Sequence, residues 1–198
     1  MNKTKVLVIV AHPDDEIIWM GGTLLKNKNK WETTIASLCR KNDKDRAPKF
    51  FKVCKLLSAR GVMGDVEDSK LNPLQIKELE KCIKQLIKEK EFDCIYTHGE
   101  NGEYGHIRHR ETHFAVKKML EDKQITSKQV LFFDYEKVEA INTDTGFNCY
   151  AYKNADKFIN LDKINLLMKR EIVQKIYGFQ KGSFEERNCR ESEAFRLL

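Results

Sequence analysis

The chain has 198 residues, of which 41% are hydrophobic and 33% charged, with a formal net charge of +6 at pH 7. This balance excludes disordered and fibrous classes and predicts one soluble globular domain over residues 1–198. The longest apolar run is far shorter than the roughly 20 residues that span a bilayer and resembles no signal peptide, so a cytoplasmic protein without a membrane partner is expected.

Segments typical of strands and of helices alternate along the chain. Strands are predicted over residues 5–11, 33–39, 92–97 and 130–135, with a short apolar segment at 62–66. Helices are predicted over residues 17–26, 48–59, 73–89, 107–120 and 164–177. Residues 136–151 are expected to be irregular or to contain β structure, and a tail follows to residue 198. Continuous apolar strands alternating with helices indicate an α/β fold, a mainly parallel sheet covered on both faces.

Two polar clusters follow predicted strands. The first is Ala11-His12-Pro13-Asp14-Asp15-Glu16, and the second is Asn101-Gly102-Glu103-Tyr104-Gly105-His106-Ile107-Arg108-His109. Ligands of parallel sheets bind beyond the carboxyl ends of the strands, which places both clusters at one rim. Burying several carboxylates is costly unless a cation or hydrogen-bond donors compensate them. A divalent metal would supply that compensation together with an activity.

The spacing within each cluster suits a metal centre. His12 and Asp15 are three residues apart across a turn, so both can reach one ion while Asp14 stays free to accept a proton. His106 and His109, three apart at a helix start, lie on one face. A His/Asp/His set leaves a coordination position for water, as in catalytic zinc sites. The six cysteines are scattered without paired spacing, which disfavours cysteine ligands.

Both motifs resemble those of the LmbE/PIG-L family of zinc-dependent N-acetylglucosaminyl deacetylases, and residues 191–197 resemble the usual ending of that family. The resemblance implies a Rossmann-like fold. It also implies that His12, Asp15 and His109 hold Zn²⁺, or another divalent ion such as Fe²⁺.

The same resemblance implies roles for the remaining polar residues of the motifs. Asp14 would be the general base, and His106 would stabilise the oxyanion or protonate the leaving amine. Tyr104 would lie near the oxyanion. Arg46, in a more loosely matching segment, would bind substrate.

Several residues keep a structural alternative beside the functional one. Asp14 could instead cap the following helix. His98 could contact substrate or be a satisfied structural histidine, and Glu103 could contact substrate or orient its loop. His113 could compete as a metal ligand. The charged segment 40–46 could be a solvated face, or it could select an anionic group on the substrate.

The predicted activity is zinc-dependent hydrolysis of the N-acetyl amide of an N-acetylglucosamine-type sugar conjugate, which releases acetate and a free amine. The partner is then a small N-acetylated sugar, and homo-oligomerisation is left open. Lysines spread over helical surfaces, without a basic block that contains aromatics, argue against nucleic acid. A hydrolase of another acyl amide and a non-catalytic metal- or sugar-binding module remain alternatives. A nucleotide-binding protein would need a glycine-rich phosphate loop where residues 12–16 stand.

Overall fold

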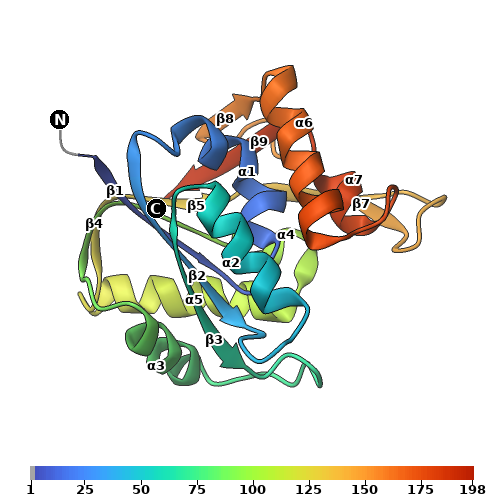
Figure 1. Cartoon of the computed structure of the whole chain (residues 1–198). Helices are drawn as coiled ribbons and strands as arrows, with labels where there is room; N and C mark the ends of the chain where they lie inside the picture. Colours follow the sequence, from blue (N-terminus) through green and yellow to red (C-terminus); the bar gives the residue numbers. More distant parts are fainter. Residues whose placement is uncertain (1–2) are drawn as a thin grey trace.

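The structure is a computed structural model that describes residues 3–198, so the first two residues of the predicted 1–198 domain lie outside the described residues. A seven-stranded sheet in the order β3-β2-β1-β4-β5-β9-β8 forms its centre (Figure 1). Its strands are β1 Thr4–Val10, β2 Trp31–Cys39, β3 Arg60–Val66, β4 Glu91–Thr97, β5 Thr126–Phe133, β8 Lys157–Asn160 and β9 Ser192–Leu197. Neighbours from β3 to β5 pair in parallel, whereas β9 is antiparallel to both β5 and β8.

Helices cover both faces of the sheet, which confirms the predicted α/β class. Helices α3 (Ile76–Leu86) and α5 (Ile107–Glu121) pack on one face. The other face carries α1 (Asp15–Asn27), α2 (Arg46–Leu56) and the π-helix η1 (Ile172–Tyr177), which continues α6 (Lys163–Glu171) (Figure 1). Two short helices, α4 (Gly102–Gly105) and α7 (Phe184–Asn188), complete the set. Within residues 3–198, no helix combines the length and apolarity needed to cross a bilayer.

Strand β1 divides the core into two layers. Val6, Val8 and Val10 belong to the layer under α1 and α2, whereas Leu7 and Ile9 belong to the layer under α3 and α5. All five side chains are fully buried. Successive side chains of a strand point to opposite faces, so a strand covered on both sides reads as a continuous apolar run. This is why the N-terminal strand was predictable from its sequence.

The sheet order reverses direction beside β1. The chain runs outward through β1, β2 and β3, then returns to place β4 on the other side of β1. The loops that leave the carboxyl ends of β1 and β4 therefore turn apart, and a crevice opens between them, which is where open α/β sheets bind ligands. Both sequence motifs leave from these two strand ends.

The later part of the chain departs furthest from prediction. Strand β5 begins at Thr126 and ends at Phe133, and Tyr135 instead starts the hairpin of β6 (Tyr135–Glu139) and β7 (Phe147–Ala151). The predicted helix over 73–89 begins only at Ile76, since the Leu74 amide donates to Glu111 Oε1 at 2.7 Å rather than entering a helix. The tail, for which no element was predicted, contains β9, which joins the sheet.

A buried carboxylate fixes β9 against α1. Glu193 Oε2 accepts from the amide and the hydroxyl of Thr23 at 2.8 and 2.7 Å, and Oε1 accepts from the Gly22 amide and Lys169 Nζ, each at 2.8 Å. A Cβ at Gly22 would lie 2.3 Å from the Leu161 side chain. Glycine is needed there because two chain segments approach closely.

Candidate metal centre

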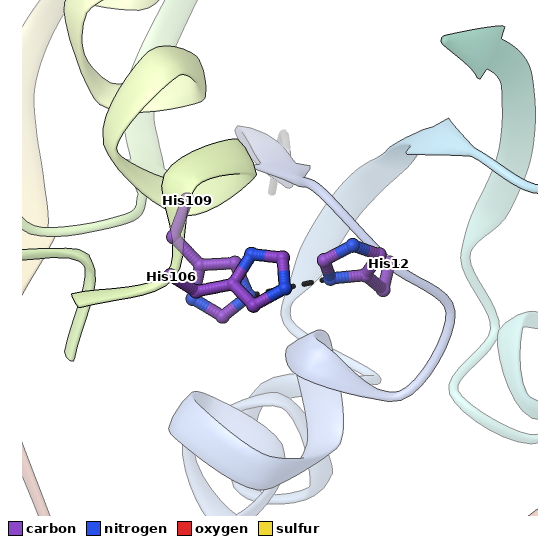
Figure 2. A group of neighbouring side chains, drawn as sticks. All are labelled: His12, His106 and His109. Atoms are coloured by element: carbon purple, nitrogen blue, oxygen red, sulfur yellow. Dashed lines mark hydrogen bonds between the residues drawn. The ribbon is translucent and has the colours of Figure 1, made fainter. Parts of the chain in front are cut away.

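Three predicted ligands present donor atoms at similar spacings, with a different oxygen of Asp15 toward each histidine. Asp15 Oδ2 lies 3.2 Å from His12 Nδ1, Asp15 Oδ1 lies 3.4 Å from His109 Nε2, and the two ring nitrogens are 3.3 Å apart. Figure 2 shows the His12 ring facing those of His106 and His109 across the crevice. A tetrahedral ion with bonds of about 2.0–2.1 Å has ligand atoms roughly 3.3–3.4 Å apart. The residues present therefore fit a four-coordinate divalent ion with one position open.

Other histidines lie within reach of the same point. Ligand atoms of His12, His106 and His109, and likewise of Asp15, His98 and His109, lie within 4.8 Å of one another. His98 Nε2, however, already accepts the Ala11 amide at 2.9 Å, so its lone pair is engaged. The geometry favours the predicted set over one that includes His98.

The ring of His12 is fixed from behind by Asp68. Oδ1 of Asp68 lies 2.9 Å from His12 Nε2, and its Oδ2 accepts from Arg40 Nε at 2.9 Å. A carboxylate at one ring nitrogen holds the proton there and leaves the other nitrogen, here Nδ1, as the ligand. Burial acts to lower the pKa of His12, but hydrogen bonds and charge from Asp15 and Asp68 raise that pKa to about 9.

The carboxylate of Asp15 is also held in place. The Trp19 indole N–H donates to Oδ1 at 3.0 Å, and the His12 amide donates to Oδ2 at 2.8 Å. Although burial opposes ionisation, His109, His12 and His98 hold the pKa of Asp15 well below its usual range. The carboxylate of Asp15 is thus charged at neutral pH.

Glu103 and His98 lie beneath the cluster, and both are fully buried. Glu103 Oε2 lies 2.8 Å from His98 Nδ1 and 2.5 Å from His109 Nδ1, while Oε1 accepts the Gly99 amide at 2.8 Å. The two imidazoles stack with centroids 3.9 Å apart. The loop after β4 turns both side chains inward, and neither of them lines the cleft. This geometry matches the structural alternatives for His98 and Glu103.

Asp14 points into the crevice rather than capping α1. Its side chain makes no capping hydrogen bond, and its φ of 113° is rare for a residue other than glycine. Its amide donates to Glu16 Oε2 at 3.0 Å, and the other oxygen of Glu16 accepts from the Tyr177 hydroxyl at 2.5 Å. Burial and the neighbouring Asp15 raise the pKa of Asp14 well above its ordinary value, against the opposing charge of Arg46.

The crevice is a small cleft of about 140 Å³. Six of the predicted residues line it, together with Ile18, Arg40, Phe184 and Glu185; the six are His12, Asp14, Asp15, Arg46, Tyr104 and His106. Arg46 forms an ion pair with Asp14, and its guanidinium lies 4.3 Å from the ring centroid of Phe179. The charged segment 40–46 therefore turns two of its arginines toward the site instead of forming only a solvated face.

His106 and Tyr104 form the opposite wall. His106 Nδ1 accepts the Arg108 amide at 3.3 Å, so the proton of a neutral ring resides on Nε2. Burial and the neighbouring His109 and His12 lower the pKa of His106 to about 3, which keeps the ring neutral. Tyr104 packs against this ring with centroids 5.7 Å apart. The wall thus offers an N–H donor rather than a cation.

Sequence reasoning missed two residues that orient the ligands. Trp19 belongs to neither motif, yet its indole N–H donates to Asp15 Oδ1. Asp68 carries no motif, but it follows the third parallel strand, and its position at the same rim was a usable signal. His113, a predicted competitor, instead contacts the His98 carbonyl through Nδ1 at 3.0 Å.

Comparisons with known proteins place these motifs in context. The sequence model of PIG-L, described as GlcNAc-PI de-N-acetylase, matches residues 7–120. Uncharacterized protein L374 of Acanthamoeba polyphaga mimivirus is 26% identical over 171 residues, which cover 79% of this chain and 74% of that protein.

Two solved structures share the fold at low sequence identity. N,N'-diacetylchitobiose deacetylase from Pyrococcus horikoshii has a TM-score of 0.68 and 16% identity, covering 100% of this chain and 84% of that one. GalB, the 4-carboxy-2-hydroxymuconate hydratase from Pseudomonas putida KT2440, has a TM-score of 0.64 and 12% identity, covering 98% and 96%. These likenesses concern the fold alone, since the two named activities differ.

Proposed function

Because this chain belongs to the PIG-L family, whose sequence model is described as GlcNAc-PI de-N-acetylase, we propose that it hydrolyses the N-acetyl amide of an N-acetylglucosamine-type sugar conjugate. The products are acetate and a free amine, and residues 1–198 act as one catalytic unit. The observation that carries the proposal is the similar spacing of the His12, Asp15 and His109 donor atoms beside an unligated carboxylate, Asp14.

Zn²⁺ is the proposed ion, and Fe²⁺ is the alternative that the same donor types accept. When bound, the ion would polarise the acetamide carbonyl as a Lewis acid and would acidify water. His12, Asp15 and His109 hold it, while Trp19 and Asp68 keep two of these ligands oriented. The remaining residues of the cleft carry the proton transfers.

Asp14 is the proposed general base. It accepts a proton from the water that attacks the carbonyl carbon, and it returns that proton to the nitrogen as the C–N bond breaks. A carboxylate whose pKa is raised toward the working pH suits both steps. The strained backbone of Asp14, held by Glu16, directs the side chain to the cleft.

His106 is the proposed oxyanion donor. Its Nε2 proton, fixed by the Arg108 amide on the other nitrogen, can donate to the oxygen on which charge develops. Tyr104 and Arg46 also line the cleft. Tyr104 is proposed to lie near that oxygen, and Arg46 to contact the sugar conjugate. Neutral His106 acts here by hydrogen bonding rather than by full charge.

The proposal is tested by measuring acetate release from zinc-loaded protein with N-acetylglucosamine, N,N'-diacetylchitobiose and an N-acetylglucosaminyl phosphoinositide. Asp14→Asn should keep its zinc and lose roughly 10²–10⁴-fold in turnover. Asp45→Asn is the matched control, because this exposed carboxylate pairs only with Lys49 among the described ion pairs. Turnover at the wild-type rate in Asp14→Asn would remove the assigned base.

The same assay separates the alternatives. Release of a different carboxylic acid from other acylated amines would favour a hydrolase of another acyl amide. Zinc binding without turnover of any substrate would favour a non-catalytic metal- or sugar-binding module.

A further inference from the structure

Arg108 lies between the two histidines of the second motif, yet its guanidinium faces away from the cleft and is fully buried. Nε donates to the Glu67 carbonyl at 2.5 Å, and Nη2 donates to Glu67 Oε2 and to the Asn72 carbonyl, each at 2.9 Å. Nη1 donates to Glu111 Oε2 at 2.6 Å. A buried guanidinium is tolerated only when its donors are satisfied in this way.

Most of these acceptors belong to the loop of residues 67–75, which joins β3 to α3. Glu67 Oε1 folds the start of the loop by accepting from the Ser69 and Lys70 amides at 2.7 and 2.6 Å. Glu111, which pairs with Arg108 through one oxygen, accepts the Leu74 amide at the far end of the loop through the other. The loop is therefore fastened at both ends to helix α5.

Asp68 is the residue that this fastening places. It directly follows the Glu67 backbone that Arg108 holds, and its Oδ1 lies 2.9 Å from His12 Nε2. A shift of the loop would separate these atoms and free the His12 ring to exchange its protonated nitrogen. Asp68 thus depends on α5, the helix that also supplies His109.

We propose that Arg108 is a positioning residue of the metal centre, which sets Asp68 against His12 and thereby selects Nδ1 of His12 as the ligand atom. Arginine is required because its planar fork bonds two carbonyls and two carboxylates at once, which a lysine cannot do. The inference rests on the proposed metal centre, because its test measures the binding of zinc at that centre. It differs from simple stabilisation of the loop because it predicts that Arg108 acts through Asp68.

The test measures zinc affinity of the metal-stripped full chain by competition with a chromophoric chelator. Arg108→Gln and Asp68→Ala should each weaken zinc binding about 10–100-fold. The double variant should bind zinc no more weakly than Asp68→Ala alone, because one residue acts through the other. A merely structural Arg108 would give losses that add.

Two further variants complete the design. Arg170→Gln is the matched control, since this arginine of α6 donates through Nε to the Cys189 carbonyl at 3.1 Å and does not line the cleft; it should keep wild-type affinity. Glu67→Ala covers the case in which Arg108→Gln fails to fold. The Glu67 side chain is 37% exposed and can be truncated without a buried cavity, yet its removal also loosens the loop and should weaken zinc binding several-fold.

Each outcome decides between named possibilities. Wild-type zinc affinity in folded Arg108→Gln, additive losses in the double variant, or wild-type affinity in Glu67→Ala would overturn the role of Arg108. Wild-type protein without zinc affinity would overturn the metal centre and this inference together. Zinc binding without acetate release would overturn only the proposed function.

Discussion

The Glu103 carboxylate serves two imidazoles at once. With Oε2 within 2.8 Å of Nδ1 on both His98 and His109, it keeps the proton of each ring on that nitrogen and turns His109 Nε2 toward the metal position. His98 uses its own Nε2 to accept the Ala11 amide at the end of β1. One buried acid therefore orients a ligand and joins the two strand ends of the site.

Replacement of this acid should weaken the metal site. In Glu103→Gln an amide N–H₂ group would stand where a carboxylate oxygen now accepts from two ring N–H groups. Because donors would then face donors, we expect a roughly 10–100-fold loss of zinc affinity. Competition with a chelator measures the change. Glu100→Gln, an exposed change in the same loop, is the control. Equal affinities for the two variants would contradict the role of Glu103.

The ion pair of Arg46 with Asp14 predicts a shift in the pH dependence of turnover. The positive charge of Arg46 acts to lower the pKa of Asp14, so its removal should raise that pKa further. In Arg46→Gln the acidic limb of the kcat/KM profile should therefore move to higher pH. Lys49→Gln, whose ion pair is with Asp45 instead, should leave the limb in place. An unmoved or lowered limb in Arg46→Gln would refute the coupling.

Single residues differ in how far sequence reveals them. Spacing within the motifs singles out His12 and Asp15, whereas the choice of His109 over His106 as a ligand is implied by the family resemblance. For Asp68 the sequence indicates only a place at the rim after β3, because its contact with His12 depends on the register of that strand. The burial of His98 and Glu103 beneath the cleft, which favours their structural alternatives, was hidden from the sequence for a similar reason. Proximity to a motif does not tell whether a side chain points into the cleft or beneath it.

Among the elements, the central strands are predictable from their continuous apolar runs, and most helices from the apolar periodicity of their sequences. The ends of these strands and helices are less predictable. The helix predicted from Pro73 starts at Ile76, because Glu111 captures the Leu74 amide from another helix. The helix predicted over 164–177 changes to a π-helix at Ile172. Such details depend on tertiary partners that no local pattern contains.

The loop of residues 67–75 should respond to acid. Amides of Lys70 and Ser69, with the Ser69 hydroxyl, lower the pKa of Glu67 from 4.5 to about 2. Because the pKa of Glu67 is lower in the folded state than in the unfolded state, its ionised carboxylate stabilises the fold. This stabilisation is fully present above about pH 4.5 and is lost as the pH falls through 2. Carbon-13 titration of the Glu67 carboxyl in metal-free protein should show the low value.

Ser69→Ala is the companion variant for this titration. It removes one hydroxyl donor from Glu67 and should move the pKa of Glu67 part of the way toward 4.5. A wild-type Glu67 that titrates like an ordinary exposed glutamate would contradict the hydrogen-bonded loop.

Across the whole molecule, strand β9 was the least predictable part of the fold. The sequence of residues 192–197 places Glu193 at a core position of the strand, which argues against a strand in isolation. The burial of the Glu193 carboxylate is explained by its tertiary partners, Lys169 of α6 and the amides of α1. The resemblance of this segment to a family ending had signalled its importance without giving that reason.

Loss of Glu193 should destabilise the entire chain. Glu193→Ala leaves a buried ammonium and two α1 amides without their acceptor, at a cost of about 3–5 kcal/mol in the free energy of unfolding. Lys169→Met should cost less, because the remaining carboxylate keeps its Gly22 and Thr23 donors. Urea denaturation of the metal-free protein measures both. Exposed Glu191→Ala is the control, and a loss under about 1 kcal/mol in Glu193→Ala would contradict the prediction.

The position of Glu193 also bears on when the site can mature during protein synthesis. A ribosome that has translated His109 has already made every candidate ligand, but not the carboxylate that accepts the Gly22 and Thr23 amides of the helix beginning at Asp15. A nascent chain at that stage carries all the candidate ligand residues, but the fold that positions them is incomplete. We therefore expect stable zinc binding only after β9 has emerged from the exit tunnel, so that translation would time the acquisition of the metal.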